Sequence, residues 1–210
     1  ALTNIVEATF ERNTEKPTSL VIVGAPYSTP DGRLFNVAFV IYKGKVVGAI
    51  PKTYLPNYAE FEEARWFESG HNVNMQINDP ILGKFTLSSK QIFTLGDLRV
   101  GVEICEDAWT PNPPSTELYL AGANLVVNLS ASNNLVGKNA YRRDLIKSIS
   151  ARNIGAYLYV SAGPTESTDD LVFDGHKMIA EDGALLAENH SRLKETSSEI
   201  SLEIDRKSVV

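Results

Sequence analysis

Leu98-Arg99-Val100-Gly101-Val102-Glu103-Ile104-Cys105-Glu106-Asp107-Ala108-Trp109 is the stretch around which the rest of the chain can be arranged. Apolar residues alternate from Leu98 to Ile104, which predicts a strand with one face buried. The strand ends at Cys105, because two carboxylates and the proline-rich segment 111–114 follow it. A thiol at such a turn is placed where a nucleophile can be displayed. The alternative is a small, inert core residue, which is common for free cysteines.

The composition is that of a folded globular domain. The 210 residues are 43% hydrophobic and 22% charged, which provides enough apolar side chains for a core. The net charge of −6 argues against a nucleic-acid or anionic-membrane partner, and no apolar run is long enough to span a bilayer. The single cysteine excludes an internal disulfide, so we expect a reducing, cytoplasmic setting.

Apolar runs and turn residues predict more strands than helices. Strands are predicted at 20–24, 35–42, 46–50, 92–95, 98–104, 124–129, 156–160, 171–173, 177–180, 184–187 and 198–204. Helices are predicted near the N-terminus and at 59–69, 115–121 and 137–153, with a polar connection over 70–80. The run 20–24 is continuously apolar, which is typical of a strand buried on both faces.

This order of elements predicts an α/β fold. Helices that occur singly between strand runs favour two sheets with helices packed outside, a four-layer α-β-β-α sandwich, over one doubly wound sheet. Polar residues follow several strands, among them Lys52, Cys105, Ser132 and Ser161. Because strand ends in layered α/β folds tend to meet at one rim, we expect these side chains to gather there.

Four motifs resemble those of the nitrilase-type carbon-nitrogen hydrolases. They are Pro-Lys-Thr-Tyr-Leu-Pro-Asn-Tyr-Ala-Glu-Phe-Glu-Glu at 51–63, Ile-Cys-Glu-Asp-Ala-Trp at 104–109, Asn-Leu-Ser-Ala-Ser at 128–132 with Gly137-Lys138 following, and Leu-Val-Phe-Asp-Gly at 171–175. Leu-Pro-Asn-Tyr-x-Glu-Phe together with Cys-Glu-Asp-x-Trp is similar to the glutaminase domains of glutamine-dependent NAD+ synthetases. The resemblance covers nearly the whole chain and implies the nitrilase-type four-layer sandwich.

The resemblance implies hydrolysis of the glutamine side-chain amide to glutamate and ammonia through a cysteine thioester, with the ammonia used for NAD+ synthesis from deamido-NAD+. It assigns the nucleophile to Cys105 and the triad lysine to Lys52, whose charge would stabilise the oxyanion. Glu60 matches a supporting glutamate beside the lysine. The implied substrate-binding residues are Tyr58, Glu106, Ser132 and Lys138.

The third member of the family's triad is a glutamate in a Phe-Pro-Glu-type segment, which residues 1–210 do not contain. We therefore expect one carbon-nitrogen hydrolase domain that lacks its N-terminal segment and has no synthetase domain. Because losing one such group typically costs about two to four orders of magnitude in rate, we expect this chain alone to be nearly inactive. The resemblance implies no cofactor here, ATP and Mg²⁺ only for the synthetase domain, L-glutamine and that domain as partners, and a homo-oligomer.

Other interpretations stay open at this point. One is a free-standing nitrilase-type amidase or carbamoylase, and another is a non-catalytic binding domain with a degenerate site. Lys52 and Glu60 can be solvated surface charges, Tyr58 can simply pack, and Ser132 can cap a helix. His71, His176 and His190 show no Cys-His signature, and no His or Cys spacing fits a metal site.

Overall fold

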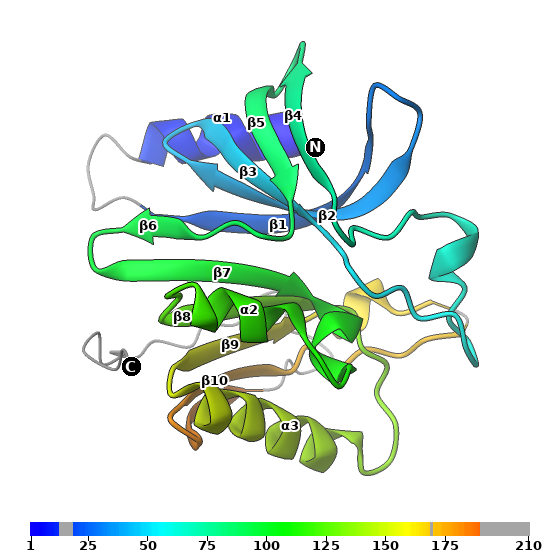
Figure 1. Ribbon diagram of the computed structural model, residues 1–210. Helices are drawn as coiled ribbons and strands as arrows, with labels where there is room; N and C mark the ends of the chain where they lie inside the picture. Colours follow the sequence, from blue (N-terminus) through cyan, green and yellow to red (C-terminus); the bar gives the residue numbers. More distant parts are fainter. Residues whose placement is uncertain (13–18, 169, 190–210) are drawn as a thin grey trace. The chain divides into compact units, whose positions relative to one another are not determined.

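The computed structural model describes residues 1–12, 19–168 and 170–189 (Figure 1). The chain divides into two compact units, residues 1–91 and residues 92–210. The strand predicted at 198–204 lies outside the described residues. No helix within the described ranges is long and apolar enough to cross a membrane.

The first unit contains a five-stranded sheet in the order β1-β2-β3-β5-β4. Its elements are α1 (Leu2–Arg12), β1 (Val21–Ser28), β2 (Leu34–Tyr42), β3 (Lys45–Pro51), the 3₁₀ turn η1 (Glu63–Arg65), β4 (Asn74–Asp79) and β5 (Gly83–Ser88). Strands β1, β2 and β3 form an antiparallel meander, and β3 runs parallel to β5. Tyr27, Phe39 and Phe85 meet edge to face in its core.

Three sequence predictions for this unit are wrong. Within the described residues, strand β1 is an edge strand that pairs with β2. None of its residues is fully buried: residues 21–23 are partly buried, and exposed and partly buried residues alternate from Gly24 onward. Residues 74–79, predicted as a connection, form β4. Apolar residues occupy every second position from Val73 to Ile77, and Val73 and Ile77 are buried. Residues 59–69 form one 3₁₀ turn in place of a helix, since Ala59 has a left-handed φ of 50°.

The second unit contains a six-stranded sheet in the order β11-β10-β9-β8-β7-β6. Its elements are β6 (Phe93–Leu95), β7 (Leu98–Ile104), the 3₁₀ turn η2 (Cys105–Trp109), α2 (Pro114–Leu120), β8 (Leu125–Ser130), α3 (Lys138–Asn153), β9 (Ala156–Ser161), the 3₁₀ turn η3 (Pro164–Glu166), β10 (Lys177–Glu181) and β11 (Ala184–Asn189). Residues 171–173, predicted as a strand, have no regular structure.

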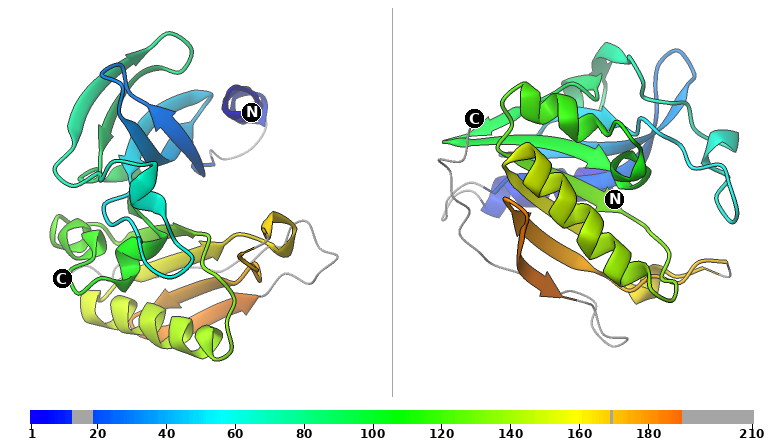
Figure 2. Two further views of the ribbon diagram at one scale, coloured as in Figure 1. Left: turned by 90° about the vertical axis from the view of Figure 1, so that its right-hand side faces the viewer. Right: turned by 60° about the horizontal axis from the view of Figure 1, so that its bottom comes forward.

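The central strands β7, β8 and β9 are parallel, and α2 and α3 provide the crossovers between them. Both helices lie on the same face of the sheet, as right-handed crossovers require (Figure 2). Val126, Tyr157 and Met178 from the sheet pack with Leu118 of α2 and Ile146 of α3 in the core between the layers. This topology brings the carboxyl ends of β7, β8 and β9 to one edge, where Cys105 begins η2.

Gly70 provides a test of the packing around the end of β3. A side-chain carbon at Gly70 would lie 2.6 Å from the carbonyl oxygen of Pro51, whereas one at Gly24 would meet nothing within 4 Å. We expect Gly70→Ala to lower the free energy of unfolding by about 1–3 kcal/mol, because the backbone of Pro51 must shift. Gly24→Ala should change it by no more than about 0.5 kcal/mol. Equal effects in urea unfolding would contradict this packing.

Candidate active site

Cys105 occupies a sharp turn at the end of β7. It has a left-handed backbone with φ of 47° and is a partly exposed free thiol. Such a conformation costs a non-glycine residue about 1–3 kcal/mol and persists only where neighbouring groups hold it. The turn ends the strand and directs the chain into η2. The predicted position of Cys105 at a strand end is therefore confirmed.

A buried amide side chain holds the backbone of this turn. Asn128 of β8 accepts a hydrogen bond from the N–H of Cys105 at 3.1 Å and donates one to the carbonyl oxygen of Cys105 at 3.4 Å. Asp107 accepts the N–H of Ile104 at 3.0 Å. The Cys105 N–H is thus already engaged within the protein. Sequence reasoning assigned no role to Asn128, although it opens the 128–132 motif.

Glu103 lies next to Asn128 because β7 and β8 pair these two residues in parallel register. Its carboxylate has no exposure and accepts hydrogen bonds from the Tyr157 hydroxyl and, at 2.8 Å, from the N–H of Ser115. Burial raises the pKa of Glu103, although hydrogen bonds from Tyr157, Ser115 and Asn128 oppose this shift. A carboxyl group therefore sits directly behind the amide that holds the cysteine turn.

Tyr159 on β9 connects the cysteine to the end of β8. Its hydroxyl donates to the Ser130 Oγ at 2.9 Å. Burial first, and then the negative charge of the Cys105 thiolate, raise the pKa of Tyr159 to about 12. The phenol therefore stays protonated near neutral pH and can donate a hydrogen bond close to the thiol.

Ser132 and Lys138, two predicted substrate-binding residues, flank the loop between β8 and α3. Ser132 is buried, and the Lys138 ammonium bonds the Asn133 Oδ1 at 3.0 Å. The same ammonium lies 4.8 Å from the ring centroid of Trp109, the last residue of η2. The structure therefore brings Lys138 together with the turn that carries Cys105 and Glu106.

Lys52 lies in the first unit, directly after β3. Its side chain is only 1% exposed, and its ammonium contacts both carboxylate oxygens of Glu63 at 2.7 Å. A buried cation needs such a partner, because leaving it unpaired costs several kcal/mol. Sequence reasoning missed Glu63, although it closes the same motif three residues after Glu60 and begins η1.

Glu60 and Tyr58 are exposed residues of the loop between β3 and η1. Tyr58 packs edge to face against Phe61, with ring centroids 5.9 Å apart. The roles of Glu60 beside Lys52 and of Tyr58 and Glu106 toward a substrate stay predictions.

The histidines occupy separate places. His71 is in a turn of the first unit, His176 is buried beside Arg142 in the second, and His190 falls outside the described residues. Among the residues that the structure describes, no three His, Cys, Asp or Glu side chains are grouped so that they could hold a metal ion.

The left-handed conformation of Cys105 can be tested through stability. We expect Cys105→Gly to be more stable than Cys105→Ala by about 1 kcal/mol, since glycine adopts this conformation without strain. The control pair is Ala108→Gly against the native Ala108 in η2, where the change to glycine should be destabilising. Urea unfolding measures all four chains. A less stable Cys105→Gly would show that position 105 has an ordinary backbone.

The raised pKa of Glu103 predicts a pH dependence of stability. Between its ordinary pKa of 4.5 and its higher folded value, the folded state keeps a proton that the unfolded state has lost. Stability therefore falls as pH rises through this window, and Glu103→Gln should remove that fall. As pH rises above 4.5, the free energy of unfolding of Glu103→Gln minus that of the native chain should therefore increase. Glu117→Gln, at an exposed position of α2, is the control and should give no such trend.

Comparison with known proteins places these features in a family. The profile of the carbon-nitrogen hydrolase family matches residues 6–209. A glutamine-dependent NAD(+) synthetase of Mycobacterium tuberculosis (strain ATCC 25618 / H37Rv) is 44% identical over 174 residues, which are 81% of this chain and 25% of that protein. One from Thermotoga maritima is 31% identical over 199 residues, 93% of this chain and 31% of that protein. The chain thus spans less than a third of the length of these relatives.

Solved structures agree with the architecture. A glutamine-dependent NAD(+) synthetase from Cytophaga hutchinsonii superposes with a TM-score of 0.68 at 29% identity, over 81% of this chain and 27% of that one. An amidase of the nitrilase superfamily from Nesterenkonia AN1 has a TM-score of 0.66 at 18% identity, over 90% and 61%, and shares the fold. The predicted α/β sandwich of nitrilase type is confirmed. On the match over residues 6–209, this chain belongs to the carbon-nitrogen hydrolase family.

Proposed function

We propose that this chain is a glutaminase domain that hydrolyses the side-chain amide of L-glutamine through a thioester on Cys105. The observation that carries the proposal is the left-handed turn that displays this thiol at the carboxyl end of three parallel strands. The similarity to glutamine-dependent NAD(+) synthetases supports glutamine as the amide.

The chemistry follows from the groups present. The Cys105 thiolate attacks the amide carbon, the carbonyl electron pair moves to oxygen, and ammonia leaves when the pair returns. By resemblance, Lys52 supplies a charge that stabilises the oxyanion, and both carboxylate oxygens of Glu63 hold its ammonium. Water then hydrolyses the thioester to glutamate. By resemblance, the proton transfers are carried out by the glutamate of the Phe-Pro-Glu-type segment, which residues 1–210 do not contain. We therefore expect turnover by this chain alone to be slow.

The remaining predicted residues recognise the amino-acid end of glutamine in this proposal. Glu106 takes the α-amino group, Ser132 contacts the substrate, and Lys138 lies near the α-carboxylate. Tyr58 forms part of the pocket wall, and Glu60 supports Lys52.

At the level of the whole protein, we propose that the ammonia passes to a synthetase domain that makes NAD+ from deamido-NAD+. The similarity to glutamine-dependent NAD(+) synthetases supports this step, for which ATP and Mg²⁺ would serve the synthetase domain. Residues 1–210 then form one hydrolase domain of a cytoplasmic homo-oligomer.

Covalent labelling tests the proposal without requiring turnover. Cys105 is the single cysteine, so mass spectrometry reports its alkylation without ambiguity. The measured quantity is the ratio of two alkylation rates, that by the chloromethyl ketone analogue of L-glutamine divided by that by chloroacetone. We expect this ratio to be at least about tenfold larger for Cys105 than for free cysteine, because the protein binds the amino-acid end of the analogue. L-glutamine should slow this labelling.

Lysine variants provide the matched control. Lys52→Met should slow labelling by the analogue by about tenfold or more, because the developing negative charge on the ketone oxygen loses its cation. Lys45→Met, at the exposed first residue of β3, the strand that Lys52 follows, should have no effect. Labelling no more selective than that of free cysteine would refute the proposal. Protection by butyramide as strong as that by L-glutamine would favour a simple amidase.

A further inference from the structure

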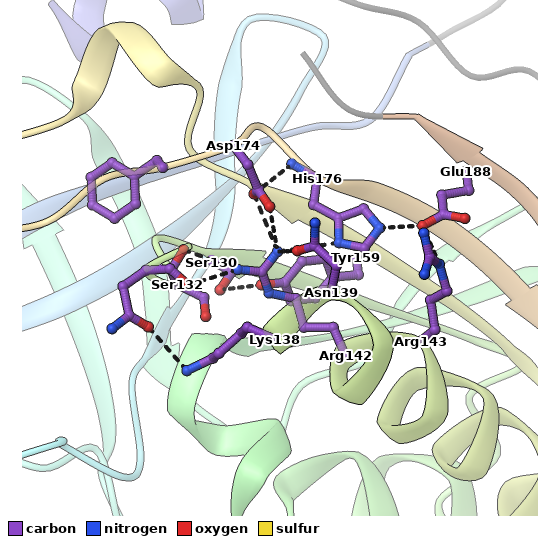
Figure 3. Close-up of polar contacts among 12 residues, drawn as sticks. Ser130, Ser132, Lys138, Asn139, Arg142, Arg143, Tyr159, Asp174, His176 and Glu188 are labelled. Carbon is purple, nitrogen blue, oxygen red and sulfur yellow. Dashed lines mark hydrogen bonds and ion pairs between the residues drawn. The ribbon is translucent and has the colours of Figure 1, made fainter. Parts of the chain in front are cut away.

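Arg142 is a fully buried arginine at the start of α3. It lies on the sheet-facing stripe of the helix with Ile146 and Ile149, at positions where an apolar side chain is usual. Figure 3 shows its guanidinium between Ser132, in the loop after β8, and His176, which directly precedes β10. Burying a charge here costs desolvation that an apolar residue would avoid, so the contacts of this group call for a reason.

One terminal nitrogen of Arg142 donates hydrogen bonds to the backbone of the loop that follows β8. Its Nη2 donates to the carbonyl oxygen of Asn133 at 2.8 Å and to that of Ser132 at 3.4 Å. The side chain of Asn133 in turn accepts the Lys138 ammonium at 3.0 Å. A single guanidinium nitrogen therefore fixes the backbone of Ser132 and, through Asn133, the position of Lys138.

The other terminal nitrogen anchors Arg142 to Asn139 of its own helix and to the segment that precedes β10. Its Nη1 shares two N–H groups among neighbours that lie within hydrogen-bond distance: both oxygens of Asp174 at 3.0 and 3.2 Å, the Asn139 Oδ1 at 3.0 Å and the His176 Nδ1 at 3.2 Å. In the tautomer that accepts from Arg142 at Nδ1, the ring proton is on Nε2 and is donated to Glu188, 2.7 Å away.

Glu188 completes this anchor on β11. It also accepts the Arg143 Nε at 2.6 Å. Burial by itself would raise the pKa of Glu188, but the hydrogen bonds from Arg143 and His176 lower it. The carboxylate therefore stays ionised and holds the His176 ring, which fixes the plane of the Arg142 guanidinium.

We propose that Arg142 is a positioning residue that sets Ser132 and Lys138 for recognition of the amino-acid end of glutamine. This inference rests on the proposed function. It assigns Arg142 to substrate selectivity and leaves the reactivity of the Cys105 thiol to Asn128 and Glu103. The planar fork is essential to the role, because a lysine keeps the charge beside Asp174 and cannot reach both sides at once.

Arg142→Lys separates the charge from the fork. The measurements are the rate of Cys105 alkylation by iodoacetamide and the concentrations of L-glutamine and of butyramide that halve it. We expect Arg142→Lys to weaken protection by L-glutamine about tenfold or more, since bonds from a charged donor to the loop are lost. The unprotected alkylation rate and the protection by butyramide, which lacks both α-substituents, should stay within about twofold of the native values.

Arg152→Lys is the control, because Arg152 is exposed in the last turn of the same helix and should leave all three measurements unchanged. Equal losses of protection by L-glutamine and butyramide, or no loss, would overturn the role of Arg142 while the proposed function stands. A native chain that L-glutamine does not protect would overturn both. Should Arg142→Lys fail to fold by circular dichroism, Asp174→Asn, which removes the anchoring charge, must show the same selective loss.

Discussion

The second unit depends on the pairing of the Asn128 side chain with the backbone of Cys105. The parallel pairing of β7 with β8 ends at Ile104, and the next residue, Cys105, has a left-handed backbone. There the Asn128 side chain takes the place of a strand neighbour and bonds both the N–H and the carbonyl oxygen of Cys105. Because the amide both accepts and donates, it fixes the peptide planes on the two sides of the Cys105 α-carbon. Glu103 can reach that amide only because the strands keep this register. The exposed thiol is thus positioned by residues that are themselves buried.

Each unit contains a buried cation that is paired with a carboxylate. Lys52 with Glu63, and Arg142 with Asp174, are ion pairs in which the cation is almost completely buried. Such pairs contribute little net stability compared with apolar packing, but removing one partner is costly. They hold the backbone in one arrangement where apolar contacts would allow several. In each case, the cation lies within a few residues of a candidate site residue or coincides with it.

Much of the fold follows from local sequence, because strand periodicity and turn residues are local signals. Alternation from Leu98 to Ile104 predicted β7, and the apolar runs 35–42 and 46–50 predicted β2 and β3. Strand β4 escaped prediction because its exposed positions are the polar residues Asn74, Gln76 and Asn78, which are typical of a connection, although Met75 and Ile77 alternate with them. The edge position of β1 could not be predicted, since its apolar run is compatible with either a central or an edge strand.

The site was less predictable than the fold. Cys105 and Lys52 occupy strand ends, as expected. Lys52 forms an ion pair with Glu63, and only the folded loop distinguishes this carboxylate from its neighbours in an acidic run. Arg142 resembled an ordinary helix-surface arginine, and its i, i+4, i+7 spacing with Ile146 and Ile149 was the signal that it faces the sheet. Its partners Asp174 and His176 are more than thirty residues away.

The ammonium of Lys138 above the indole of Trp109 gives the chain an intrinsic optical reporter. Tyr141 meets the same indole edge to face at 5.2 Å, so the ring lies between a charge and a phenol. Indole emission responds to nearby charge, and any anion that draws Lys138 away alters that field. The other tryptophan, Trp66, is 63% exposed and belongs to the first unit. The emission spectrum therefore combines a solvent-exposed fluorophore with one that senses the loop preceding α3.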